Sequence, residues 1–283
     1  PGLEKDKGIG TMRRHLVLAT AASWLWLFAS ATPALAVDVA PPRGAPGEFG
    51  ISVGAEYTTG EDGGTTRTDI WYIPLTLHYE SRRWLWWATI PGLIVEGTGD
   101  VVIIGGGGSG GHGPGTPGTT ARRTESGIGD IIAAASYRLL PQTGGRPALD
   151  LAAKVYFGTA DETRGLGTGE NDYAVQLGIT GDIGTFAWSG TGVYLVTGDP
   201  VGVTYEDVFY GRLEVEQDFS RNSVGAALDA QEATVAGGDA PAKLTGYLTT
   251  RTGSNTKLTV YLLKGLSDAS PDRGAGITFS VLY

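Results

Sequence analysis

The stretch FGISVGAEY, residues 49–57, decides the fold. Its odd-numbered residues are apolar, whereas its even-numbered residues are small or polar. Successive side chains of a β-strand point to opposite faces, so a period of two residues gives a strand one apolar and one polar face. The stretch therefore predicts a strand that separates an apolar surface from a polar one.

The same strand pattern recurs along the chain and predicts about 12 strands in all. The further segments cover residues 70–79, 84–95, 128–140, 148–158, 170–181, 185–197, 205–219, 223–231, 241–250, 256–265 and 273–283. No window after Ala36 keeps apolar residues at helical spacing. The connections are alternately short and long, which is typical of an up-and-down antiparallel sheet.

Two all-β architectures fit this pattern: a soluble sandwich or lipocalin-like barrel, and a membrane-spanning barrel. They differ in what the polar face meets, because a soluble barrel exposes it to water and a transmembrane barrel turns it toward the lumen. In the membrane-spanning case we expect the following side chains to face the lumen: Glu56, Asp69, His78, Asp130, Arg138, Asp150, Lys154, Asp172, Gln176, Arg212, Glu214 and Glu216. Either a plug of mutually satisfied ion pairs or a selective pore is compatible with such a set.

Three features favour the membrane-spanning barrel. The predicted number of strands is even, and aromatic residues gather at strand ends, where interfacial girdles lie. The chain ends with ITFSVLY, residues 277–283, an alternating strand with a terminal aromatic residue. Phe279 and Tyr283 resemble the signal by which the barrel assembly machinery recognises outer-membrane barrels. The sequence thus predicts a membrane-spanning up-and-down antiparallel β-barrel with short periplasmic turns and longer extracellular loops.

The N-terminal residues predict export. Met12 is followed by two arginines, an apolar stretch over residues 16–29 and the small-residue motif Ala34-Leu35-Ala36. This order is typical of a cleavable secretory signal peptide; a membrane-anchor helix is the alternative, which the short apolar stretch disfavours. We expect residues 1–36 to be upstream sequence and signal peptide, 37–47 a periplasmic segment, and 48–283 a barrel in the outer membrane of a Gram-negative bacterium.

The second half of the chain resembles a known family. The segments that carry the resemblance are SGIGD (126–130), ASYRLL (135–140), KVYFGTAD (154–161), GLGTG (165–169) followed by Asp172-Tyr173, and KGLSDASPD (264–272). Together they are similar to the bacterial outer-membrane proteins of the MetA-pathway of phenol degradation family. Phe157 departs from the family, which tends to have a proline-threonine turn there. The resemblance implies an outer-membrane barrel that passes aromatic or other hydrophobic compounds.

Composition and motifs exclude several other functions. A net charge of −9 disfavours binding of nucleic acid, and the absence of cysteine excludes disulfides and cysteine metal sites. His78 and His112 lack the neighbours that a catalytic or metal site needs, so we expect no enzyme activity and no metal. Residues 108–113 match G-x-G-x-x-G, but Pro114 and Pro117 follow where a helix must begin, so we expect a loop and no cofactor.

The sequence therefore predicts an outer-membrane channel for passive passage of small, hydrophobic or aromatic compounds. Its expected partners are these molecules, outer-membrane lipid and lipopolysaccharide, and the barrel assembly machinery through the C-terminal strand. Two alternatives stay open: a structural or adhesive barrel with a plugged lumen, and an outer-membrane lipid-modifying enzyme. The Gly-rich loop over residues 105–118 is expected to be extracellular or to fold over the pore.

Overall fold

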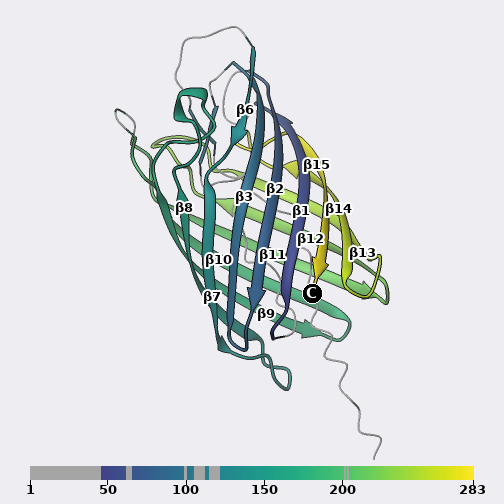
Figure 1. The fold of residues 1–283 in the computed structure, drawn as a ribbon. Coiled ribbons are helices and arrows are strands. Elements are labelled where there is room, and N and C mark those ends of the chain that lie inside the picture. The colour runs from purple at the N-terminus through teal and green to yellow at the C-terminus, as the bar shows by residue number, and fades with distance from the viewer. Residues whose placement is uncertain are drawn as a thin grey trace, which may run out of the picture.

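The chain forms a closed antiparallel β-barrel (Figure 1), seen in a computed structural model that describes residues 46–61, 66–98, 101–104, 112–114, 122–200, 202 and 204–283. The expected signal peptide, most of the segment 37–47 and most of the Gly-rich loop lie outside the described residues. Of residues 112–114 only the backbone is described.

Twelve strands build the wall, as the alternation predicts, when β6 and β7 are taken as one interrupted strand. Each strand pairs with the next, and β1 pairs with β15 to close the barrel. The wall strands are β1 (Phe49–Gly60), β2 (Thr68–Glu80), β3 (Trp84–Gly97), β6 (Arg123–Ile128), β7 (Ile131–Leu140), β8 (Ala148–Phe157), β9 (Asp172–Ile183), β10 (Phe186–Val196), β11 (Val208–Phe219), β12 (Asn222–Gln231), β13 (Ala242–Arg251), β14 (Thr256–Gly265) and β15 (Arg273–Leu282).

The two ends of the barrel differ. Short turns join β2 to β3, β9 to β10 and β11 to β12 at one end, which we call the turn end. The longer connections gather at the other end, the loop end. A small hairpin of β4 (Val101–Ile103) and β5 (His112–Pro114) and the 3-10 turn η1 (Glu162–Arg164) lie there. In the described part of the chain, no helix has the length and apolar character needed to cross a membrane.

One wall strand is interrupted, where the sequence predicts a continuous strand over residues 128–140. Residues 92–97 of β3 pair with β6, and residues 84–89 pair with β7. Gly129 and Asp130 lie between β6 and β7 and belong to neither strand. Pro91 of β3 lies opposite this break, and its carbonyl accepts a hydrogen bond from Gly129 N at 2.8 Å. Proline has no N–H to donate to a ladder, so regular pairing cannot continue through this position.

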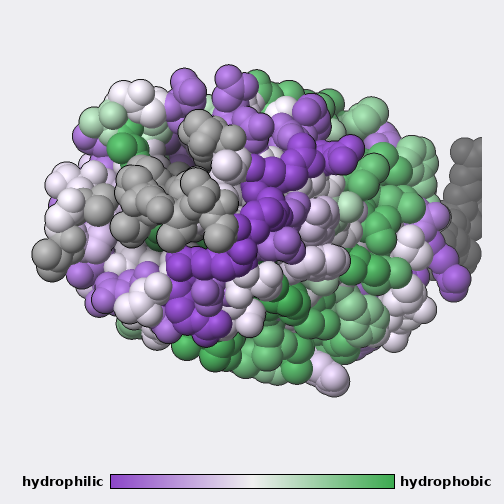
Figure 2. Space-filling view, turned by 90° about the horizontal axis from the view of Figure 1, so that it is seen from above, coloured by the Kyte–Doolittle hydropathy of each residue, from purple (hydrophilic) through white to green (hydrophobic). Residues whose placement is uncertain are grey.

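The apolar face of the sheet points outward. Leu213 and Leu262 are 65% and 70% exposed, whereas Arg212 is 2% exposed on the opposite face of the same wall. A water-soluble barrel would bury the apolar row and expose the charges. Figure 2, seen from the loop end, shows hydrophilic residues over this end and hydrophobic residues along the side of the barrel. The arrangement is that of a barrel with an apolar belt around a polar interior.

Candidate functional site

An ion-paired network covers the inner wall at β11 and β12. Arg212 donates from Nε and Nη2 to Glu214 Oε2 at 3.0 and 2.8 Å, and from Nη1 to both oxygens of Asp229 at 3.0 and 3.1 Å. Alternation puts Arg212 and Glu214 on one face of β11, and the register puts Asp229 opposite Arg212. Tyr210 also donates its hydroxyl to Asp229. All these side chains are buried, so the guanidinium and the carboxylates compensate each other.

Two tyrosines reach across glycines to carboxylates on the inner wall, and the first of them extends the Arg212 network. Tyr247 on β13 donates to Glu214 Oε1 on β11 at 2.8 Å, and its ring covers Gly225 of the intervening strand β12. Tyr261 on β14 repeats the arrangement over Gly276 of β15 and donates to Glu56 Oε2 on β1 at 2.8 Å. A Cβ atom at either glycine would overlap the tyrosine ring, so only glycine allows this close approach.

Toward the loop end, the inner wall carries two apolar clusters beside its buried charged side chains. One cluster comes from β7 to β11 and comprises Ile132, Tyr156, Ala174, Val193, Leu195, Val208 and Tyr210. A second joins β2 and β3 to the loops and comprises Ile70, Tyr72, Leu93, Ile103, Ala160 and Leu166. Ile103 of the β4–β5 hairpin and Leu166 of the loop after β8 are almost fully buried, so both connections extend the apolar lining over the end of the barrel.

The loop over residues 158–171, which we call the strap, is bonded to the interrupted strand. Asp130 accepts a hydrogen bond from Ala160 N at 3.0 Å, and the Thr159 hydroxyl donates to Gly129 O at 3.0 Å. Arg164 adds an ion pair with Glu125 of β6 at 2.8 Å. β8 ends at Phe157, and within the described residues no strand pairs with the second edge of β6. The strap therefore lies where a continuous β-ladder would otherwise complete the wall.

The structure places most of the residues expected in the lumen on the inner, buried face, although it separates them into groups. Arg212 and Glu214 share one network, Glu56 belongs to the second tyrosine unit, and Arg138 pairs with Asp150 at 2.9 Å toward the turn end. Lys154 lies with its Nζ 5.9 Å from the centroid of the Trp87 ring. The other buried members of the expected set are His78, Asp130, Asp172, Gln176 and Glu216.

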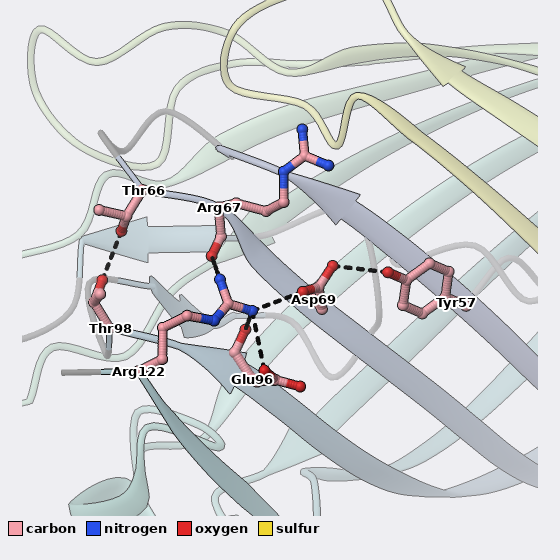
Figure 3. Close-up of polar contacts among 7 residues, drawn as sticks. All are labelled: Tyr57, Thr66, Arg67, Asp69, Glu96, Thr98 and Arg122. Carbon is pink, nitrogen blue, oxygen red and sulfur yellow. Dashed lines mark hydrogen bonds and ion pairs between the residues drawn. The ribbon is translucent and has the colours of Figure 1, made fainter.

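Asp69 is a correction, because it lies on the outer face of the barrel. It shares the phase of Trp71 and of the exposed apolar row of β2, since two residues separate side chains on the same face. There Asp69 accepts a hydrogen bond from the Tyr57 hydroxyl at 2.8 Å and pairs with Arg122 at 2.7 Å (Figure 3). Arg122 also reaches Glu96 at 3.3 Å, so this outer cluster joins the ends of β2 and β3 to the chain that enters β6.

The expected set lacks several partners that the structure supplies. Asp229, Tyr247 and Tyr261 complete the two networks, and each lies on the inner phase of its strand. Alternation within residues 223–231 would have identified Asp229, but no sequence signal pairs a tyrosine with a glycine on another strand. No group of three or more His, Asp or Glu side chains among the described residues is arranged to hold a metal ion.

Comparison with known proteins supports the fold. No family model and no curated protein sequence matches the chain. An outer membrane channel from Pseudomonas putida F1 is similar in structure with a TM-score of 0.67 at 12% identity, over 85% of this chain and 97% of the channel. The β domain of the Bordetella autotransporter BrkA has a TM-score of 0.51 at 9% identity, over 85% of this chain and 100% of that domain. At these identities the likeness concerns the fold, which is that of outer-membrane barrels.

Proposed function

We propose that the protein is an outer-membrane channel that lets small, weakly polar molecules, including aromatic ones, pass passively. The observation that carries the proposal is that the barrel interior combines apolar clusters toward the loop end with buried charges that pair with one another. The apolar clusters lie around Val193 and Leu93. Next to the first cluster, Arg212 pairs with Glu214 and Asp229.

Such an interior favours a solute with both apolar surface and a polar group. Burial of apolar surface stabilises a solute by roughly 25 cal/mol per Å², so the apolar clusters would attract a small ring compound without holding it tightly. The tyrosine hydroxyls and carboxylates of the Arg212 network offer the polar group of such a solute a hydrogen-bond donor or acceptor. A passive path needs this balance, because a permeant must enter readily and also leave.

Three further assignments belong to the same proposal. The long loops would face the exterior and the turn end the periplasm, as in bacterial outer-membrane barrels. Export by a signal peptide that ends at Ala36 and assembly through Phe279 and Tyr283 would deliver the chain to that membrane. Membership of the MetA-pathway of phenol degradation family, which the resemblance over residues 126–283 implies, would agree with an aromatic permeant.

The test uses two variants of β10 that change opposite faces of the strand. V193S/L195S replaces two buried residues of the apolar cluster, and V196S replaces an exposed residue of the outer belt. We expect V193S/L195S to lower uptake of labelled phenol by porin-deficient cells about 30-fold, since each of the two polar substitutions costs about 1 kcal/mol of apolar contact. V196S should leave uptake unchanged.

Folding is checked separately by heat-modifiable migration on unboiled gels, so that loss of uptake is not confused with loss of the barrel. Equal phenol uptake by wild type, by V193S/L195S and by cells without the protein would refute the channel and favour a plugged structural barrel. Lipid hydrolysis by the purified protein would instead favour an enzyme.

A further inference from the structure

Two cations face outward side by side at the loop end of the barrel. Lys264 of β14 and Arg273 of β15 are direct partners in the antiparallel register. Both are exposed, and both lie on the phase of the apolar belt, with Leu262 below Lys264 and Ile277 below Arg273. Like charges directly opposite each other on adjacent strands destabilise a sheet. An anion bound between them would relieve this repulsion.

The protein itself does not supply that group among its described residues. The side chains of Lys264 and Arg273 form no hydrogen bond or ion pair with the described part of the chain. The flanking partners in the same row are uncharged: Leu244 lies opposite Lys264 on β13, and Thr59 lies opposite Arg273 on β1.

Two carboxylates at this end of the barrel are engaged by other arginines. Asp272 precedes Arg273 in the chain and pairs with Arg67 at 3.3 Å. Asp69, the next residue in the row beyond Thr59, is held by Arg122 at 2.7 Å. No described carboxylate thus pairs with Lys264 or Arg273, and a group from outside the described chain can do so.

The apolar surroundings indicate where that group comes from. Leu266 continues the outer face beyond Lys264 and is 55% exposed, so the cation lies between two exposed leucines. A basic side chain with apolar residues on both sides is placed for the boundary between lipid chains and headgroups, where long cationic side chains extend to the polar layer. Phosphate is the anion of that layer, and arginine binds it with a planar fork while lysine binds it as a point charge.

We propose that Lys264 and Arg273 form a binding site on the outer wall for the phosphate of a lipid headgroup in the leaflet at the loop end. The site depends on the barrel lying in a membrane and not on what its lumen carries. It would fix the rotation of β14 and β15 against the surrounding lipid, next to the β1–β15 pair that closes the barrel.

The experiment compares K264Q/R273Q with R146Q/R221Q. The second variant removes the same charge from exposed arginines at the turn end. Folded full-length protein in uncharged detergent is titrated with dioctanoyl phosphatidic acid or with dioctanoyl glycerol, which lacks the phosphate, and bound lipid is counted by native mass spectrometry. Each basic residue near an anionic surface contributes about fivefold to binding. We therefore expect K264Q/R273Q to bind phosphatidic acid about 30-fold more weakly, and R146Q/R221Q to match wild type.

A second measurement separates a lipid site from a site for any anion and is independent of binding strength. Phosphatidic acid should raise the resistance of wild type to urea, and equimolar inorganic phosphate should not. Without lipid, K264Q/R273Q should be at least as stable as wild type, because it lacks the like-charge pair. Equal lipid binding by the two double variants, or equal stabilisation by inorganic phosphate, would overturn the proposal.

Discussion

Substitution of Gly225 by alanine tests the inner network most sharply. A Cβ atom at this position would lie 2.7 Å from Cε1 of Tyr247 and closer still to the end of the ring, so the ring must move. The hydrogen bond of 2.8 Å from the Tyr247 hydroxyl to Glu214 is then lost. A hydrogen bond to a charged group contributes about 1.5–3 kcal/mol, and a forced rotamer costs about 0.5–1.5 kcal/mol.

Part of this loss is offset, because alanine restricts the unfolded chain more than glycine and thereby stabilises the fold by about 0.4–1 kcal/mol. We expect G225A to lower the free energy of unfolding by about 2–3 kcal/mol. The matched control is G246A on β13, where an added Cβ atom meets nothing within 4 Å. It should be neutral or stabilising by up to about 1 kcal/mol.

The assay is urea unfolding in phospholipid vesicles, followed by the fluorescence of the tryptophans of the barrel. A double-mutant cycle with Y247A isolates the contact, because the cost of G225A should largely disappear once the ring is gone. If G225A costs the same in the Y247A background as in wild type, or no more than G246A, the reasoning about the glycine is refuted.

Three further outcomes follow from the contacts. R212M should lower the free energy of unfolding by about 3–5 kcal/mol in the same urea assay, because it leaves Glu214 and Asp229 buried without a counter-charge; a loss below about 1 kcal/mol would contradict the network. R122Q should leave the urea midpoint close to that of wild type, since this outer ion pair with Asp69 is 42% exposed at the arginine; a loss as large as that of R212M would contradict its placement. D130A removes the acceptor of Ala160 N and should speed hydrogen exchange in the strap, measured by mass spectrometry, while β13 stays protected; unchanged exchange would show that Asp130 does not fasten the strap.

The overall barrel was predictable because its signal is local. In residues 49–57 the alternation alone determines which side chains face outward, and the same rule holds around the wall. The two prolines Pro74 and Pro91, which face each other on β2 and β3, could have shown that the strand pattern breaks nearby. The break after Ile128 was nevertheless missed, because it depends on which strand lies opposite Pro91.

The interior was less predictable because its contacts cross strands. Arg212 and Glu214 are two residues apart and were assigned together, whereas Asp229 and Tyr247 reach them only through the register of three strands. Asp69 was wrongly assigned to the lumen because of its charge, although it lies on the same face of β2 as the exposed Trp71. Charge identifies candidates, but phase and register decide which face and which partner each one has.

The central claim, passive passage of weakly polar molecules through the lumen, is tested most directly by an uptake ratio. Porin-deficient cells with and without the full-length protein are given labelled phenol or a labelled uncharged sugar at the same low concentration, and initial uptake is measured for each. The apolar lining around Val193 and Leu93 predicts that the protein raises phenol uptake by a larger factor than sugar uptake. Equal uptake with and without the protein, or a preference for the sugar, would contradict the account.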